Sequence, residues 1–221
     1  MKNKRRYFII TISVFLVVVF GFMFNKFGGV TRIATLNFPD FTVEKLIRSN
    51  NNKFIKIESV DLSNASKILK YDMVLVRVHG STLDRSHFEA IKKAMEKRVA
   101  VFSTESDNNE INTLTGRELE YISVLMDNGS VKNYRSMLNY VRAKIDNKKF
   151  FNKNYDEPVI IPENYFFHLG EDQFFSSYAD YQKFYEASGK YKPNAPRIVF
   201  LAGNINIQNS NEEHISAIIK S

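Results

Sequence analysis

The sequence predicts an α/β fold: a doubly wound, flavodoxin-like, mostly parallel sheet with added helices, preceded by one transmembrane helix. Residues 73–78 are apolar except for Arg77, and such a run, rich in valine, is typical of a strand buried on both faces of a parallel sheet. A helical stripe follows over residues 84–97, which Asp84 can cap, and then a second apolar run at residues 99–103. Strand, helix and strand in about thirty residues make one βαβ unit.

The residues before this unit continue the same alternation. Residues 32–38 form a short apolar strand that ends at a proline, and a helix fits residues 42–49. Residues 54–62 alternate between apolar and polar side chains, which favours a strand near an edge, and a short helix fits residues 63–70. The order of these elements favours a flavodoxin-like sheet.

After residue 106 the pattern becomes mainly helical. Helices are predicted over residues 114–126, 130–145 and 176–187, with an extended segment at 159–161, a strand at 197–202 and a last helix from Asn209. Tyr178, Tyr181 and Tyr185 form a stripe that is expected to face a core. Because no C-cap signal precedes Ser221, we expect the last α/β unit to be truncated. The predicted divisions are an anchor at 1–27, an α/β domain at 31–150, and a linker with the start of a second unit at 151–221.

The N-terminus has the features of an uncleaved signal anchor. Residues 7–24 carry no charge over 18 residues, which is just enough for a helix to cross the hydrocarbon core. No small-residue cleavage site follows, and residues 2–6 are strongly basic, so we expect the N-terminus inside and everything after residue 27 outside the cytoplasmic membrane. The alternative is a cleaved signal peptide.

Composition excludes several classes of protein. The net charge is +7, but four of these charges precede the apolar run, and the remaining +3 gives no basic surface of the kind that binds nucleic acid. The absence of Cys excludes disulfides and thiolate metal sites. No pair of histidines has the spacing of a zinc site and no glycine pattern fits a nucleotide, so neither a metal site nor a catalytic residue is assigned.

Polar residues at the carboxyl ends of two predicted neighbouring strands are candidates for ligand binding, because ligands collect at that edge of open α/β sheets. They could meet a propionate or a metal, and the alternative for the histidine is a hydrogen bond to the backbone at a strand end. The candidates are Arg77, His79, Ser81, Ser103, Thr104 and Glu105.

Three further histidines lie in different contexts. His168 follows three aromatic residues and could be an axial haem ligand, or else a packed structural residue. His87 and His214 lie on predicted helices, where we expect them to face solvent.

Three stretches together resemble the large subunit of cobaltochelatase (CobN) and the related H subunit of magnesium chelatase. They are residues 74–103, residues 120–141 with Tyr121, Gly129 and Asn133, and residues 165–219 with an aromatic-His element, a Tyr-rich helix, a Pro-Arg pair and an apolar strand. The resemblance implies ATP-driven insertion of a metal ion into a tetrapyrrole in cobalamin or porphyrin metabolism, with the ATPase on separate partner subunits. It also implies that this chain is an N-terminal portion, inactive alone, since the family's tetrapyrrole and metal sites lie mostly in later domains.

The predicted anchor departs from the usual cobaltochelatase pattern and would place the domain away from cytoplasmic ATP. An alternative function is therefore an extracytoplasmic component that binds haem or another tetrapyrrole, or removes the metal from haem. A third possibility is an anchored α/β scaffold without enzymatic activity.

Overall fold

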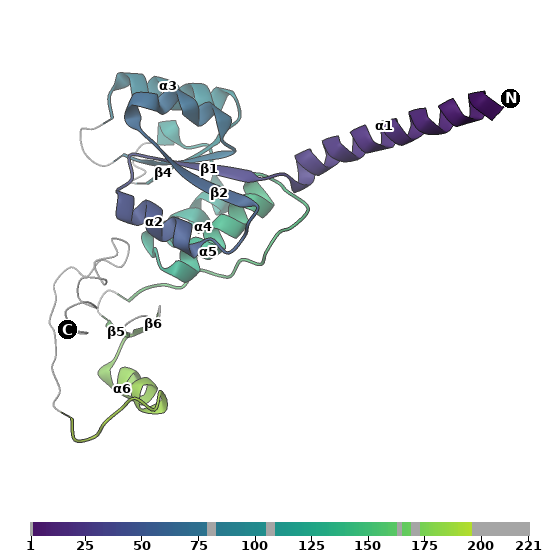
Figure 1. Ribbon diagram of the computed structural model, residues 1–221. Coiled ribbons are helices and arrows are strands. Elements are labelled where there is room, and N and C mark those ends of the chain that lie inside the picture. Colours follow the sequence, from purple (N-terminus) through teal and green to yellow (C-terminus); the bar gives the residue numbers. More distant parts are fainter. Residues whose placement is uncertain (1, 79–82, 105–108, 163–164, 169–172, 196–221) are drawn as a thin grey trace. The chain divides into compact units, whose positions relative to one another are not determined.

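The computed structural model describes residues 2–78, 83–104, 109–162, 165–168 and 173–195 (Figure 1). The chain divides into two compact units that interleave along the sequence. The first comprises Met1–Asn37, Asn51–Leu114 and Leu138–Tyr155, and the second comprises Phe38–Asn50, Thr115–Met137 and Asp156–Ser221. The predicted division at residues 27 and 150 stays a prediction.

The first unit is built on a parallel sheet of four strands. These are β1 (Thr31–Leu36), β2 (Ile55–Val60), β3 (Met73–Arg77) and β4 (Ala100–Thr104). Their order is β2-β1-β3-β4, and all three neighbouring pairs are parallel. The α/β class with a parallel sheet is therefore confirmed, and this order is that of the first four strands of a flavodoxin-like sheet. The finer prediction, helices covering both faces, stays a prediction.

Burial along the strands follows the predicted patterns. Met73, Val74, Leu75 and Val76 in β3 are all fully buried, as expected for a strand flanked by neighbours on both sides. The alternating strand β2 lies at the edge of the sheet, as predicted. Successive side chains of a strand point to opposite faces of the sheet. A continuous apolar run therefore indicates that both faces are buried, and an alternating sequence indicates that one face is.

One face of the sheet packs against three helical segments of the same unit. These are η1 (Leu62–Lys70), α3 (Arg85–Glu96) and η2 (Asn109–Ile111), and α3 lies along the sheet in Figure 1. Alternate strand residues such as Ala34, Val74 and Val101 form one buried cluster with Ile68 and Ile91. The segment predicted as a short α-helix at 63–70 is a 3₁₀ helix, interrupted by Asn64 with φ −119° and ψ 22°.

Helix α3 begins with a capping box. The Asp84 carboxylate accepts hydrogen bonds from the amides of Ser86 (2.8 Å) and His87 (3.2 Å), and the amide of Asp84 donates to Nδ1 of His87 (3.0 Å). Two otherwise unpaired helix-end donors are thereby satisfied, together with the cap's own amide. The expectation that His87 faces solvent is wrong, because its side chain is only 13% exposed and closes this cap.

The middle of the chain is helical. Helix α4 (Gly116–Asp127) is followed by α5 (Val131–Tyr140), which continues without a break into a π-helical turn, η3 (Val141–Ile145). The predicted helices at 114–126 and 130–145 are thus confirmed apart from the wider last turn. In that turn the Asp146 amide donates to the carbonyl of Val141 at 2.8 Å.

The described part of the second unit also contains α2 (Asp40–Ser49), the antiparallel strands β5 (Phe166–His168) and β6 (Gln173–Phe175), and α6 (Tyr178–Ala187). The hairpin of β5 and β6 was not predicted. The expectation that the tyrosine stripe faces a core is wrong, since no residue of α6 is buried. Instead, its rings pack on the hairpin: Phe166 stacks on Tyr181 at 6.2 Å, and Phe175 contacts Phe184 at 5.0 Å between ring centroids. The predicted strand at 197–202 and the helix from Asn209 lie outside the described residues.

Helix α1 (Lys2–Gly28) precedes the sheet and contains the predicted span. Its residues Thr11–Gly28 are long and apolar enough to cross a membrane, and 6% of that stretch is buried within the protein. This property rests on length and composition alone, which a signal sequence shares.

Candidate functional site

The carboxyl edge of the sheet carries the residues that the sequence singled out. Asn37 directly follows β1; it has a φ of +63° and donates from Nδ2 to the carbonyl oxygen of Arg77 at 2.8 Å. In a sheet of this order the connection after β1 leads to one side and the connection after β3 leads to the other, so the Asn37–Arg77 contact lies at the topological switch point. Asn tolerates this left-handed conformation better than most residues.

The structure brings three of the predicted site residues together at this edge. Arg77 is the register partner of Thr104 on β4, and Ser103 precedes Thr104. The Ser103 side chain is fully buried, and its hydroxyl donates to the carbonyl of Thr104 at 3.1 Å. Ser103 is thereby held by the backbone, whereas Arg77 is only partly buried. His79, Ser81 and Glu105 lie outside the described residues.

His168 occupies the end of β5, with its backbone opposite Gln173 of β6, and its side chain is outside the described part. The structure therefore places this residue on an aromatic hairpin and leaves its ligand role a prediction. Among the described residues, no group of three or more His, Asp or Glu side chains could hold a metal ion.

A fully buried arginine that was not predicted organises the other end of the first unit. Arg142 donates from Nη1 to the carbonyls of Gly29 (2.8 Å) and Phe54 (3.1 Å) and to the hydroxyl of Thr31 (3.0 Å). Its Nη2 donates to the carbonyl of Phe150 at 2.8 Å and to that of Gly28 at 3.4 Å. One guanidinium thus joins the end of α1, the start of β1, the residue before β2 and the loop after η3.

The positive charge of Arg142 is stabilised by neutral oxygen acceptors and by one aromatic ring. Burial lowers the pKa of Arg142, and the nearby Asp146 carboxylate opposes that shift; burial also raises the pKa of Asp146. Asp146 itself accepts from the Thr31 hydroxyl at 2.5 Å and pairs with Lys148 at 3.4 Å. The guanidinium carbon lies 5.3 Å from the centre of the Phe54 ring, within the range of a cation–π contact.

A helical wheel could have found Arg142. It lies four residues after Leu138, a position on the same face of a helix, and Leu138 is an apolar residue of the predicted helix at 130–145. An arginine on a buried face needs several acceptors, which signals a structural or functional centre.

The loop of residues 148–155, predicted as a linker, is tied to this centre at several points. The amides of Lys149 (2.8 Å) and Phe150 (3.1 Å) both donate to the carbonyl of Phe27 at the end of α1. Phe151 has a φ of +61°, a conformation that costs a bulky residue roughly 1–2 kcal/mol. Its ring stacks on that of Phe54 at 4.3 Å, and Asn52 donates to its carbonyl at 2.9 Å.

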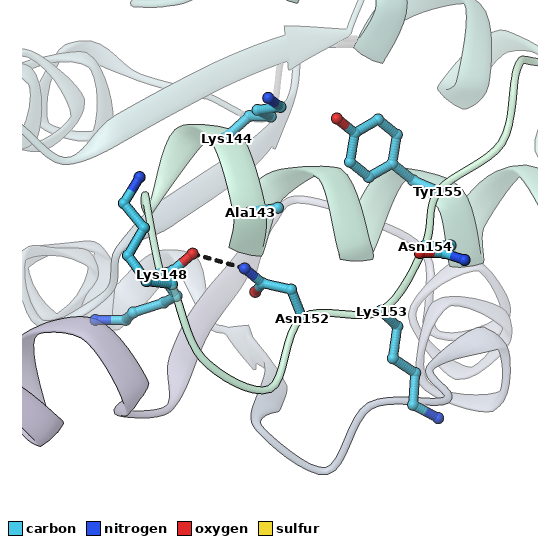
Figure 2. Close-up of a pocket in the computed structure, with 8 residues that line it drawn as sticks. Ala143, Lys144, Lys148, Asn152, Lys153, Asn154 and Tyr155 are labelled. Carbon is cyan, nitrogen blue, oxygen red and sulfur yellow. Dashed lines mark hydrogen bonds between the residues drawn. The ribbon is translucent and has the colours of Figure 1, made fainter.

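A surface hollow of about 560 Å³ opens beside this loop. It is lined by residues 143–144, 148–149 and 152–155, four of which are lysines and none of which is acidic. We name it the lysine hollow (Figure 2). Figure 2 shows the ring of Tyr155 pointing toward Lys144, whereas Lys153 extends to the other side of the loop.

A second hydrogen-bonded centre lies in the other unit, where Asn133 holds an extended segment. The Asn133 side chain makes two bonds to Val159, donating to its carbonyl (2.7 Å) and accepting from its amide (2.9 Å). The Asn128 carboxamide oxygen accepts from the amide of Ile161 at 2.8 Å. Two amide side chains thus take the place of a neighbouring strand for residues 159–161.

The remaining residues of the predicted pattern serve the same centre. The Tyr121 hydroxyl donates to the carbonyl of Asp156 at 2.5 Å, and the amide of Asp156 donates to the Ser136 hydroxyl at 3.1 Å. Gly129 leaves room for the Tyr134 ring, because a Cβ atom at residue 129 would lie 2.3 Å from the Tyr134 hydroxyl oxygen. Tyr121, Gly129 and Asn133 therefore shape one structural feature.

Comparison with known proteins identifies this part of the chain. Residues 119–221 match the family model described as CobN/Magnesium Chelatase, a range that includes Tyr121, Gly129 and Asn133. The predicted resemblance to the CobN/magnesium chelatase family is thereby confirmed for residues 119–221, slightly less than half of the chain. The first of the three resembling stretches, residues 74–103, lies before the matched range.

A solved structure is also similar to this chain: the catalytic subunit of cobaltochelatase from Mycobacterium tuberculosis, at 15% identity and a TM-score of 0.46. The similarity covers 64% of this chain and 12% of that chain, so the present chain matches only a small part of that subunit's length. No curated protein matches the sequence.

Replacement of Arg142 by lysine tests the buried centre. One ammonium group cannot reach the four carbonyls and the hydroxyl that the guanidinium bonds, so we expect the Arg142→Lys variant to lose about 2–4 kcal/mol of unfolding free energy. Urea unfolding of the full chain in detergent measures this loss. The matched control is Lys144→Ala in the same π-helical turn, an exposed position that should change stability by no more than about 0.5 kcal/mol. Equal effects of the two substitutions would contradict a special role for Arg142.

Replacement of Asn133 by alanine tests the centre in the family-matched range. We expect the Val159 amide to exchange with solvent about 10- to 100-fold faster, because its acceptor is removed. Hydrogen exchange followed by NMR or mass spectrometry measures this rate. As the control, Ser136→Ala removes the acceptor of Asp156 and should accelerate exchange at that residue while leaving Val159 slow. Unchanged exchange at Val159 in Asn133→Ala would show that other contacts hold the segment.

Proposed function

We propose that this chain is part of a membrane-anchored CobN/magnesium-chelatase-family subunit that acts in the insertion of a metal ion into a tetrapyrrole. The observation that carries this proposal is the match of residues 119–221 to the family model. In the proposed assembly, ATP is hydrolysed by separate partner subunits, and this portion is inactive alone. Its role is to position the parts of the assembly that hold the tetrapyrrole and the metal.

The anchor in this proposal is α1. The uncharged run at residues 7–24 is rich in Phe, Ile, Val and Leu, each of which favours insertion by roughly 0.3–0.6 kcal/mol on the biological scale. The basic residues 2–6 precede it and favour a cytoplasmic N-terminus. The domain from Thr31 onward would then lie outside the cytoplasm, away from cytoplasmic ATP.

That location supports a second candidate function, namely capture of haem or another tetrapyrrole outside the cytoplasm or removal of its metal. The aromatic hairpin favours it. The ring of Tyr181 contacts those of Phe166 and Phe175, and the same hairpin carries His168 at the end of β5. Aromatic side chains with a histidine can bind the face and the iron of a haem.

Deletion of the coding sequence distinguishes insertion from removal. If the chain acts in insertion, the deletion strain should accumulate metal-free tetrapyrrole, measured by fluorescence of cell extracts against the metal-bound form. If it acts in removal, the strain fed with haem should instead retain intact haem, and an unchanged ratio in both conditions would favour a scaffold. Re-expression of the unaltered chain is the control and should restore the original ratio.

A fusion reporter tests the proposed location. A reporter that is active only outside the cytoplasm, joined after Ser221, should be active and should sediment with membranes, because the basic N-terminus stays inside. Activity in the soluble fraction would indicate cleavage after the apolar segment. An inactive reporter would place the domain in the cytoplasm and would strengthen the ATP-dependent insertion proposal at the expense of tetrapyrrole capture.

A further inference from the structure

We propose that the lysine hollow binds the phosphate groups of anionic phospholipids at the membrane surface where α1 ends. This inference rests on the proposed anchoring of the chain by α1. The occupant is a phospholipid head group, which is recognised by its phosphodiester charge.

The first argument is the position of the hollow on the polypeptide. Lys149 and Phe150 are bonded through their amides to the carbonyl of Phe27, in the last turn of the span-length stretch Thr11–Gly28. The Lys148 ammonium donates to the carbonyl of Lys26 at 3.2 Å. The hollow is thus fixed within one helical turn of the end of the apolar segment, at the level where head groups would lie.

The second argument is the apolar surface between the hollow and α1. Phe150 and Phe151 are about half exposed, at 48% and 49%, although the backbone at both is held by hydrogen bonds. The Phe151 ring lies 5.9 Å from that of Phe24 on α1. Exposed aromatic rings that continue the apolar side of a helix toward a basic surface are typical of segments that lie in a membrane interface.

The third argument is the exposure of the lysines and the charge of their partners. Lys148 is nearly buried and pairs with Asp146, so its charge is compensated. Lys144, Lys149 and Lys153 are exposed. The ammonium of Lys149 donates to the side-chain oxygen of Asn147 at 2.6 Å, and that of Lys153 donates to the carbonyl of Asn51 at 2.5 Å, both of them neutral acceptors. The positive charge of these groups remains available to an anion.

The arrangement of these lysines favours a membrane surface over a single soluble anion. In Figure 2, Lys144 and Lys153 extend to different sides of the loop and do not converge on one point. Dispersed, exposed ammonium groups compete poorly with water for one free phosphate, whereas a membrane presents many phosphates at fixed depth. The anchor would supply the proximity that makes such weak contacts effective.

The experiment uses the full chain in lipid nanodiscs and reads the accessibility of each lysine by acetylation and mass spectrometry. Nanodiscs of phosphatidylcholine are compared with nanodiscs that also contain phosphatidylglycerol. We expect Lys144, Lys149 and Lys153 to react about fivefold more slowly in the anionic nanodiscs, and high salt to remove this protection. Lys92 and Lys93, exposed on α3, are the internal controls and should react equally in both. Equal reactivity of the hollow lysines in both lipids would overturn the inference.

A pair of matched variants provides a second measurement. The selectivity of the full chain for spin-labelled phosphatidylglycerol over phosphatidylcholine should fall at least fivefold in the Lys144→Gln/Lys149→Gln variant. The Lys92→Gln/Lys93→Gln variant makes the same change in charge and should keep the selectivity. An equal loss in both variants would mean that net charge alone attracts the lipid and would overturn a specific site.

Two further outcomes separate this inference from the proposals on which it rests. If inorganic phosphate protects the same lysines equally in phosphatidylcholine nanodiscs, the hollow is a site for free phosphate and the lipid assignment is wrong. If the chain does not incorporate into nanodiscs of either lipid, the anchor fails and the inference fails with it. Incorporation without lysine protection overturns the inference alone and leaves the anchor intact.

Discussion

The first unit depends on the satisfaction of one buried positive charge. Arg142 is completely inaccessible, and removing a guanidinium from water is costly unless acceptors replace the lost hydration. Four carbonyls and one hydroxyl do so for the two terminal nitrogens, an aromatic ring packs beside the group, and these partners come from segments that are far apart in sequence. Because a guanidinium presents its donors in a rigid plane, these segments must meet around it in one arrangement.

The irregular backbone around Arg142 is a consequence of that requirement. The π-helical turn at Val141–Ile145 widens the end of the helix, and Asn147 and Phe151 adopt φ values of +55° and +61°. These conformations bring the Phe150 carbonyl to the guanidinium and turn the loop of residues 148–155 back toward α1. The same loop then carries its lysines and phenylalanines beside the end of the apolar helix, which links a local packing constraint to the proposed membrane-facing surface. π-helical turns are frequent at functional sites.

In the second unit, side-chain hydrogen bonds satisfy the backbone groups of an extended segment. The extended segment at residues 159–161 has backbone groups that need partners, and side chains at the junction of α4 and α5 supply them. Asn is suited to this role because its carboxamide both donates and accepts, as a peptide group does. These contacts give Tyr121, Gly129 and Asn133 a common structural role: each shapes the turn between α4 and α5 or the segment that crosses it.

The sequence by itself determined the elements whose signals are local. The burial of β3, the edge position of β2, the parallel α/β class and the Asp84 cap all follow from two-residue or helical periodicity and from capping chemistry within a few residues. At the carboxyl edge, the neighbourhood of Arg77, Ser103 and Thr104 followed from strand order alone. The burial of Ser103 did not, because residue type gives no measure of how deeply a strand end is covered.

Only the tertiary structure decided the features that depend on distant partners. Arg142 takes acceptors more than 100 residues away, such as Gly29, and no local pattern specifies such a set. The loop of residues 148–155 looks like a linker because its composition is polar and aromatic, yet its shape comes from bonds to Phe27 and Asn52. The β5–β6 hairpin has strands of three residues each, too short for periodicity to reveal, and it is stabilised by rings from α6. Local periodicity thus determined where the strands and helices lie in the sequence. Hydrogen bonds to buried groups between distant residues determined how the segments between these elements pack.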